Sequence, residues 1–159
     1  MNDGISITHN DIDITIDTMK KEMPDVERSM LYAGAFLIKD KAKEEFVRKL
    51  PAATKSNPKY NDTLLDAIRL TKIDGGTITI HTLGSRDSSS GTYRARFFEG
   101  GTKDRYQKTR NGNKLKKKKF IGKISPLNFF GTAVQTMEGQ AFSTMQKILD
   151  NYIESKNNG

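Results

Sequence analysis

One stretch organises the chain: Thr92-Tyr-Arg-Ala-Arg-Phe-Phe-Glu-Gly-Gly-Thr102. Its threonine and aromatic residues favour a β-strand over residues 93–98, because such side chains suit a pleated, half-buried surface. The strand should end after the glutamate, since the paired glycines adopt positive φ without steric cost. We therefore predict a structural corner, which consists of Glu99, Gly100, Gly101 and Thr102.

Glu99 has two interpretations. An exposed carboxylate paired with Arg94 or Arg96 would contribute only about 0–1 kcal/mol. A buried carboxylate that accepts backbone N–H bonds from the glycine turn would instead fix the geometry of the corner. We favour the buried carboxylate and expect Glu99→Ala to destabilise the domain or its assembly.

The two longest periodic segments predict helices. Apolar residues from Val26 onward recur at spacings of three and four, which is typical of a helix with a wide apolar stripe. Pro24 suits the first turn of this helix, and the helix should end before Pro51. A second helical pattern begins at Asn128 or Thr132 and runs to about residue 155.

Shorter alternating segments predict strands. Isoleucines alternate over residues 5–7 and 12–16, although residues 11–17 also suit the start of a short helix that ends near residue 23. Residues 63–68 suit a short helix or turn. Residues 68–73 and 77–83 alternate around Asp74-Gly-Gly76, which is typical of a hairpin turn. Residues 93–98 and 120–124 would complete the meander.

The predicted fold class is therefore α+β. It consists of an antiparallel β-sheet of three to four strands, packed by a long N-terminal and a long C-terminal helix, with a protruding basic β-hairpin loop. At 159 residues the chain is a single domain by size. Within it, residues 1–23 form an N-terminal extension, residues 103–123 the basic loop and residues 156–159 a tail.

The sequence offers little for catalysis or metal binding. It contains no cysteine, and His9 and His81 have no second ligand at metal-binding spacing. Phosphate-binding and dinucleotide-binding glycine motifs are missing, and Glu44-Glu45 suits a solvated helix face. We predict a protein that is not an enzyme, with no catalytic residues, metal or cofactor.

Neither a membrane span nor a signal peptide is evident. No apolar run approaches the roughly 20 residues that cross a bilayer. The first residues lack the basic and apolar regions of a leader. We expect a soluble intracellular product without a membrane partner.

The net charge of +8 is concentrated in one segment. Residues 103–123 hold ten basic residues and only one acid, so the rest of the chain carries a net charge of −1. The basic residues are Lys103, Arg105, Lys108, Arg110, Lys114, Lys116, Lys117, Lys118, Lys119 and Lys123. Three interpretations stay open: a solvated loop, a contact with nucleic acid, or a contact with an acidic protein surface.

The order of these parts resembles a known family. A long helix ending at Pro51 is followed by the corner Phe97-Phe-Glu-Gly-Gly-Thr102, a variable loop, and Pro126-Leu-Asn-Phe-Phe130 at the start of the last helix. Over residues 24–155 this order is similar to the small head–tail joining or tail-completion proteins of long-tailed bacteriophages. The family often has Thr-Gly-x-Leu after the proline, whereas this chain has Asn61-Asp-Thr-Leu64, and its basic segment is longer than usual.

The resemblance implies a structural virion protein of the tail or neck, assembled in the cytoplasm of the bacterial host. It implies a ring homo-oligomer, a hexamer or dodecamer, at the head–tail interface, where it would act in the neck, in tail completion or as a tail terminator. The partners would be further copies of the chain, neighbouring connector or adaptor proteins, and tail-tube proteins. The basic loop would face genomic DNA in the lumen, with non-specific contact, or an adjoining ring. A free nucleic-acid-binding protein that uses residues 103–123 is the alternative.

Overall fold

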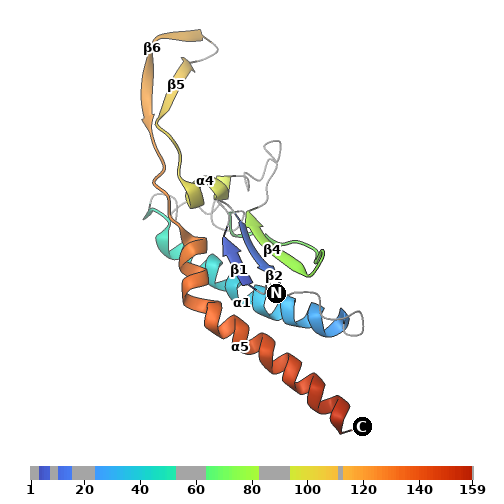
Figure 1. Ribbon diagram of the computed structural model, residues 1–159. Helices are drawn as coiled ribbons and strands as arrows, with labels where there is room; N and C mark the ends of the chain where they lie inside the picture. The colour runs from blue at the N-terminus through green and yellow to red at the C-terminus, as the bar shows by residue number, and fades with distance from the viewer. Residues whose placement is uncertain are drawn as a thin grey trace.

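The structure, a computed structural model, describes residues 4–7, 11–15, 24–52, 64–82, 94–110 and 113–158. Its helices are α1 (Pro24–Lys49), α4 (Ala95–Gly100) and α5 (Phe129–Asn157). Its strands are β1 (Gly4–Ile7), β2 (Asp11–Thr15), β3 (Ile68–Leu70), β4 (Thr77–Thr82), β5 (Arg105–Arg110) and β6 (Asn113–Gly122). The predicted α+β class, with a long helix near each end of the chain, is confirmed (Figure 1).

Four strands form the main sheet, in the order β1-β2-β4-β3 with antiparallel neighbours. The predicted hairpin turn joins β3 to β4: Asp74 and Thr77 exchange backbone hydrogen bonds of 3.0 and 2.9 Å. Gly75 and Gly76 both have positive φ there, as such a turn requires. The prediction of a strand on each side of this turn is confirmed.

The N-terminal segment belongs to this sheet. β2 lies between β1 and β4, and Ile14 is paired with Ile78 in the register. The alternation of isoleucines therefore forms strands over residues 4–7 and 11–15. The end of the alternative short helix, near residue 23, lies outside the described residues. The predicted extension supplies two of the four strands.

The two long helices, α1 and α5, lie on one face of the sheet, where Ile14, Ile78 and Ile80 are buried (Figure 1). α1 and α5 pack against each other, and Gly34 lies at this contact: a Cβ there would lie 2.9 Å from the Met145 sulfur. α1 begins at Pro24 and ends just before Pro51, as predicted. Among the described helices, none is both long and apolar enough to span a bilayer.

The predicted strand over residues 93–98 is wrong, because residues 95–100 form α4. Ala95 and Glu99 are buried and Phe98 is partly buried. These positions have the i, i+3, i+4 spacing of a helix, which outweighs the β-propensity of the aromatic residues. Residue 93 itself lies outside the described residues. Gly101 has positive φ at the end of α4, whereas Gly100 belongs to the helix.

Residues 120–124 do not return to the main sheet as predicted. Phe120 belongs to β6, which pairs antiparallel with β5 in a separate two-stranded sheet. We call β5 and β6 together the arm, and Figure 1 shows the arm extending away from the helices and the main sheet. The arm carries the charge of the predicted basic loop, and residues 111–112 between its strands lie outside the described residues.

Two shorter predictions are partly tested. Residues 53–63, which include the start of the predicted short helix or turn, lie outside the described residues. Leu64 and Leu65 form a helical turn, but Ile68 already belongs to β3. Lys156 and Asn157, expected in the tail of residues 156–159, belong to α5.

Candidate functional site

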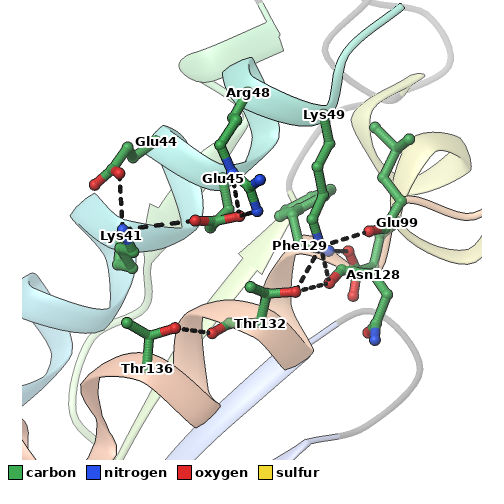
Figure 2. Close-up of polar contacts among 11 residues, drawn as sticks. Lys41, Glu44, Glu45, Arg48, Lys49, Glu99, Asn128, Phe129, Thr132 and Thr136 are labelled. Atoms are coloured by element: carbon green, nitrogen blue, oxygen red, sulfur yellow. Dashed lines mark hydrogen bonds and ion pairs between the residues drawn. The ribbon is translucent and has the colours of Figure 1, made fainter.

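Glu99 caps the start of α5. Its side chain is buried, with the residue only 6% exposed. One carboxylate oxygen accepts hydrogen bonds from the backbone N–H of Phe129 at 2.7 Å and of Phe130 at 3.3 Å (Figure 2). The first N–H groups of a helix have no partner within the helix, and a negative charge there interacts favourably with the helix dipole.

The donors to Glu99 differ from those predicted. A buried carboxylate that accepts backbone N–H bonds is present, but the donors belong to α5 rather than to the glycine turn. The residue just before α5, Asn128, has left-handed φ and ψ and makes no side-chain capping bond. Glu99 therefore provides, from α4, the acceptor that an N-cap side chain usually provides.

Backbone hydrogen bonds on either side of Glu99 also join the end of α4 to the segment before α5. The N–H of Leu127 donates to the carbonyl of Phe98 at 2.7 Å, and the N–H of Thr102 donates to the carbonyl of Ile124 at 2.9 Å. The Ile124 N–H in turn donates to the Thr102 hydroxyl at 2.9 Å. We call the bonded segments, residues 98–102 and 124–130, the corner clamp.

Gly101 is the point of closest approach within the corner clamp. With φ 72° and ψ −176° it adopts a conformation open essentially to glycine alone. A Cβ at this position would lie 2.9 Å from both the Ile124 carbonyl oxygen and Pro126 Cδ. Gly101, the second glycine of the predicted corner, is therefore required both because its φ is positive and because a Cβ would clash with Ile124 and Pro126.

Lys49, at the end of α1, binds the clamp from the other side. Its ammonium donates to the carbonyl oxygens of Leu127 at 2.9 Å and Asn128 at 3.1 Å, and to the Thr132 hydroxyl at 2.5 Å. Figure 2 shows Lys49 reaching from α1 to the first turn of α5. Lys49 was missed in the sequence, where a lysine in a last helical turn suggests only a dipole interaction.

Aromatic packing fills the space behind these polar contacts. The Phe46 ring of α1 lies 4.7 Å from the ring of Phe129 and 5.8 Å from that of Phe98, between ring centroids. Phe129 and Phe130 meet edge to face at 4.8 Å. The clamp thus joins α1, α4 and α5 around one apolar cluster, and it fixes the base of the arm.

Glu45 forms an ion-pair group on α1 near the clamp. Its buried carboxylate pairs with Arg48 and, at 3.5 Å, with Lys41, which also bonds to Glu44 (Figure 2). The hydrogen bond from Arg48 holds the pKa of Glu45 below its usual range. The hydrogen bond to Glu44 raises the pKa of Lys41. The sequence interpretation of Glu44-Glu45 as a solvated face therefore holds for Glu44 but not for Glu45, which is buried.

Residues 103–123, which contain the arm, run between the two halves of the corner clamp, and their described basic side chains face solvent. Those of Lys103, Arg105, Lys108, Lys116, Lys117, Lys118, Lys119 and Lys123 are exposed. Near the far end of the arm, Arg110 is paired with Asn113 and Lys114 with Thr109 in the strand register. The side chains of Arg110 and Lys114 lie outside the described part. Across the strands Tyr106 and Phe120 meet edge to face at 5.5 Å, 47% and 54% exposed.

The two histidines are the remaining candidates for chemistry. His81 lies in β4, opposite Arg69 and Asp11 in the register, and His9 lies outside the described residues. In the part of the chain that the structure covers, no three His, Cys, Asp or Glu residues gather in a metal-binding group. What the site offers chemically is a fixed corner and an exposed row of cations.

Comparisons with known proteins found no match. Family models, curated proteins and solved structures were each searched, and none matched this chain.

Proposed function

We propose that this protein is a structural, non-catalytic subunit of a tailed bacteriophage, which forms a ring with copies of itself at the head–tail interface. One observation carries the proposal: the corner clamp holds the base of an arm that contains the excess positive charge of the chain. The resemblance in the order of parts, from the long first helix to the Pro-aromatic segment, is its second support.

The placement of charge supports a role in binding an acidic partner surface. The rest of the chain is nearly neutral, so copies of it can approach one another without strong repulsion, whereas the arm would attract an acidic partner. Ring closure requires heterologous contacts, in which one surface of a subunit meets a different surface of its neighbour. In a closed ring every arm points in the same direction relative to the axis, which multiplies the attraction.

Neutralising the arm tests the proposal. Replacing Lys116–Lys119 by serine should leave the free energy of unfolding unchanged, because these side chains are exposed. Rings should still form, as seen by sedimentation and electron microscopy, but phage that carry the variant should fail to join heads to tails. Replacing the exposed Lys147 and Lys156 of α5 by serine is the control and should leave joining intact. A wild-type chain that stays monomeric at all concentrations, or joining that survives without the four lysines, would contradict the proposal.

The alternative function is free nucleic-acid binding by the arm. Its specific support is the exposed Tyr106–Phe120 pair beside the lysines, since aromatic rings stack on unpaired bases. A salt titration of DNA binding separates the two functions. A monomer that binds DNA with steep salt dependence favours the alternative. Ring formation without DNA favours the structural subunit.

A further inference from the structure

Strand β3 is an edge strand of the main sheet. The sheet order places it last, and within the described residues no other strand pairs with its outer side. The N–H of Thr71 donates to the carbonyl of Thr79 at 2.9 Å, which sets the alternation along the strand. The backbone groups of Arg69 therefore face β4, and those of Ile68 and Leu70 face outward. An extended chain could add to the sheet there.

A groove lies beside this edge. It has a volume of about 450 Å³ and is lined by residues 66 and 68–72, and on its other side by α1 through Tyr32, Phe36, Lys39 and Lys43. The four α1 residues are spaced by four, three and four positions, so they form one row along the helix. We call this space between α1 and β3 the edge groove.

The lining of the edge groove is apolar and basic. Phe36 is 47% exposed, its ring is stacked 6.1 Å from that of Tyr32, and the Lys39 ammonium lies 4.2 Å above it. The lining carries the cations Lys39, Lys43, Arg69 and Lys72 against the single carboxylate of Asp66. Lys39 also lies 3.6 Å from the exposed carboxylate of Asp40, outside the lining.

We propose that the edge groove binds an extended acidic segment of a partner protein, which adds to β3 as a fifth strand. Its backbone would bond to the outward groups of Ile68 and Leu70. Alternate side chains would then point toward α1. There carboxylates would meet Lys39 and Lys43, and an apolar side chain would cover Phe36. This is the geometry of peptide binding by strand addition, in which the backbone bonds give affinity and the lining gives specificity.

The inference does not rest on the proposed phage role or on the arm. β3 is only three residues long, so few backbone bonds form, and we expect weak affinity that falls as salt increases.

The experiment uses a labelled peptide that carries one valine and two aspartates at alternate positions, so that all three face the same side of the strand, and the charge control has lysine in place of both aspartates. Binding is measured by fluorescence anisotropy on the full chain with Lys116–Lys119 replaced by serine, so that the arm does not attract the acidic probe. Amide hydrogen exchange then locates the site. The acidic peptide should bind and slow exchange at Ile68 and Leu70, whereas the basic peptide should not bind.

Variants of the lining complete the test. Lys39→Glu with Lys43→Glu should weaken binding by about tenfold, as expected for reversing two partly exposed charges. Lys147→Glu on α5 should leave it unchanged. If the acidic peptide fails to bind, or protects amides elsewhere but not in β3, the proposal is wrong. It is also wrong if the peptide leaves β3 unchanged while self-association protects the amides of β1 and β3, because the groove is then an interface between copies.

Discussion

Replacing Glu99 by alanine would leave the backbone N–H groups of Phe129 and Phe130 without the carboxylate oxygen that accepts them. A hydrogen bond to a charged group contributes ~1.5–3 kcal/mol, and we assign most of the loss to the 2.7 Å bond because the other is long at 3.3 Å. A helix cap contributes on a similar scale, about 0.5–2 kcal/mol. We expect Glu99→Ala to lower the free energy of unfolding by about 2–4 kcal/mol.

Thermal and urea denaturation followed by circular dichroism measure this change. For a domain of this size each kcal/mol shifts Tm by about 2–4 °C, so Tm should fall by roughly 4–16 °C. Glu99→Gln keeps an acceptor oxygen but loses the charge, and should lie between the wild type and alanine. Glu138→Ala, at an exposed position of α5, is the control, with an expected change below about 0.5 kcal/mol.

The result that would refute this reasoning is a Glu99→Ala variant that melts with the wild type. A second readout is local: exchange of the Phe129 and Phe130 amides should accelerate in Glu99→Ala. Unchanged exchange at these two amides would show that the carboxylate does not cap α5 in solution.

Three further predictions concern the corner clamp, Lys49 and the ion pairs of Glu45. Gly101→Ala should destabilise the fold by at least ~1–3 kcal/mol, because positive φ and contact with Ile124 and Pro126 both oppose a Cβ; urea denaturation measures it. Lys49→Met should cost about 1–3 kcal/mol in the same assay, because the carbonyls at the start of α5 lose their charged donor. The ion pairs of Glu45 lower its pKa in the fold, so they stabilise the protein above about pH 4.3, where an unperturbed glutamate is ionised. This stability disappears as pH falls through the lowered pKa, and Glu45→Gln should flatten that acid limb of a stability–pH curve.

Matched variants make these predictions specific. Gly75→Asn keeps positive φ accessible and meets open space, so it should be far milder than Gly101→Ala. Lys43→Met, which removes another lysine of α1, should change the free energy of unfolding little. A Glu45→Gln curve parallel to that of the wild type below pH 4.3 would show that Glu45 is not the group that titrates.

The sequence predicted the helices and strands that depend on residues close to one another along the chain. The spacing of apolar residues from Val26 onward and the Asp74-Gly-Gly76 turn each depend on neighbours along the chain, and α1, β3 and β4 follow them. Residues 93–98 show the limit, because aromatic β-propensity favoured a strand while Ala95, Phe98 and Glu99 already had helical spacing. The contact of this segment with the rest of the core settles the choice.

The site depended on contacts between distant residues. Glu99 stood out because a carboxylate precedes paired glycines, but its donors lie 30 and 31 positions away in α5. Lys49 bonds to residues 78 to 83 positions away. The spacing of residues along the chain carries no signal of contacts so far apart. The sequence could therefore predict that Glu99 is buried, but not which backbone groups it would bind.

The two hydrogen bonds between Thr102 and Ile124, each of 2.9 Å, hold together the ends of the segment between these residues. Both ends of this segment lie side by side in the corner clamp. A replacement segment therefore needs only to start at Thr102 and end at Ile124. Doubling the length of a flexible replacement would cost only about 0.6 kcal/mol in closure entropy. We therefore expect segments of other lengths and charges to be tolerated here while the rest of the fold is kept, and a foreign peptide grafted between these two residues should be displayed without disturbing the core.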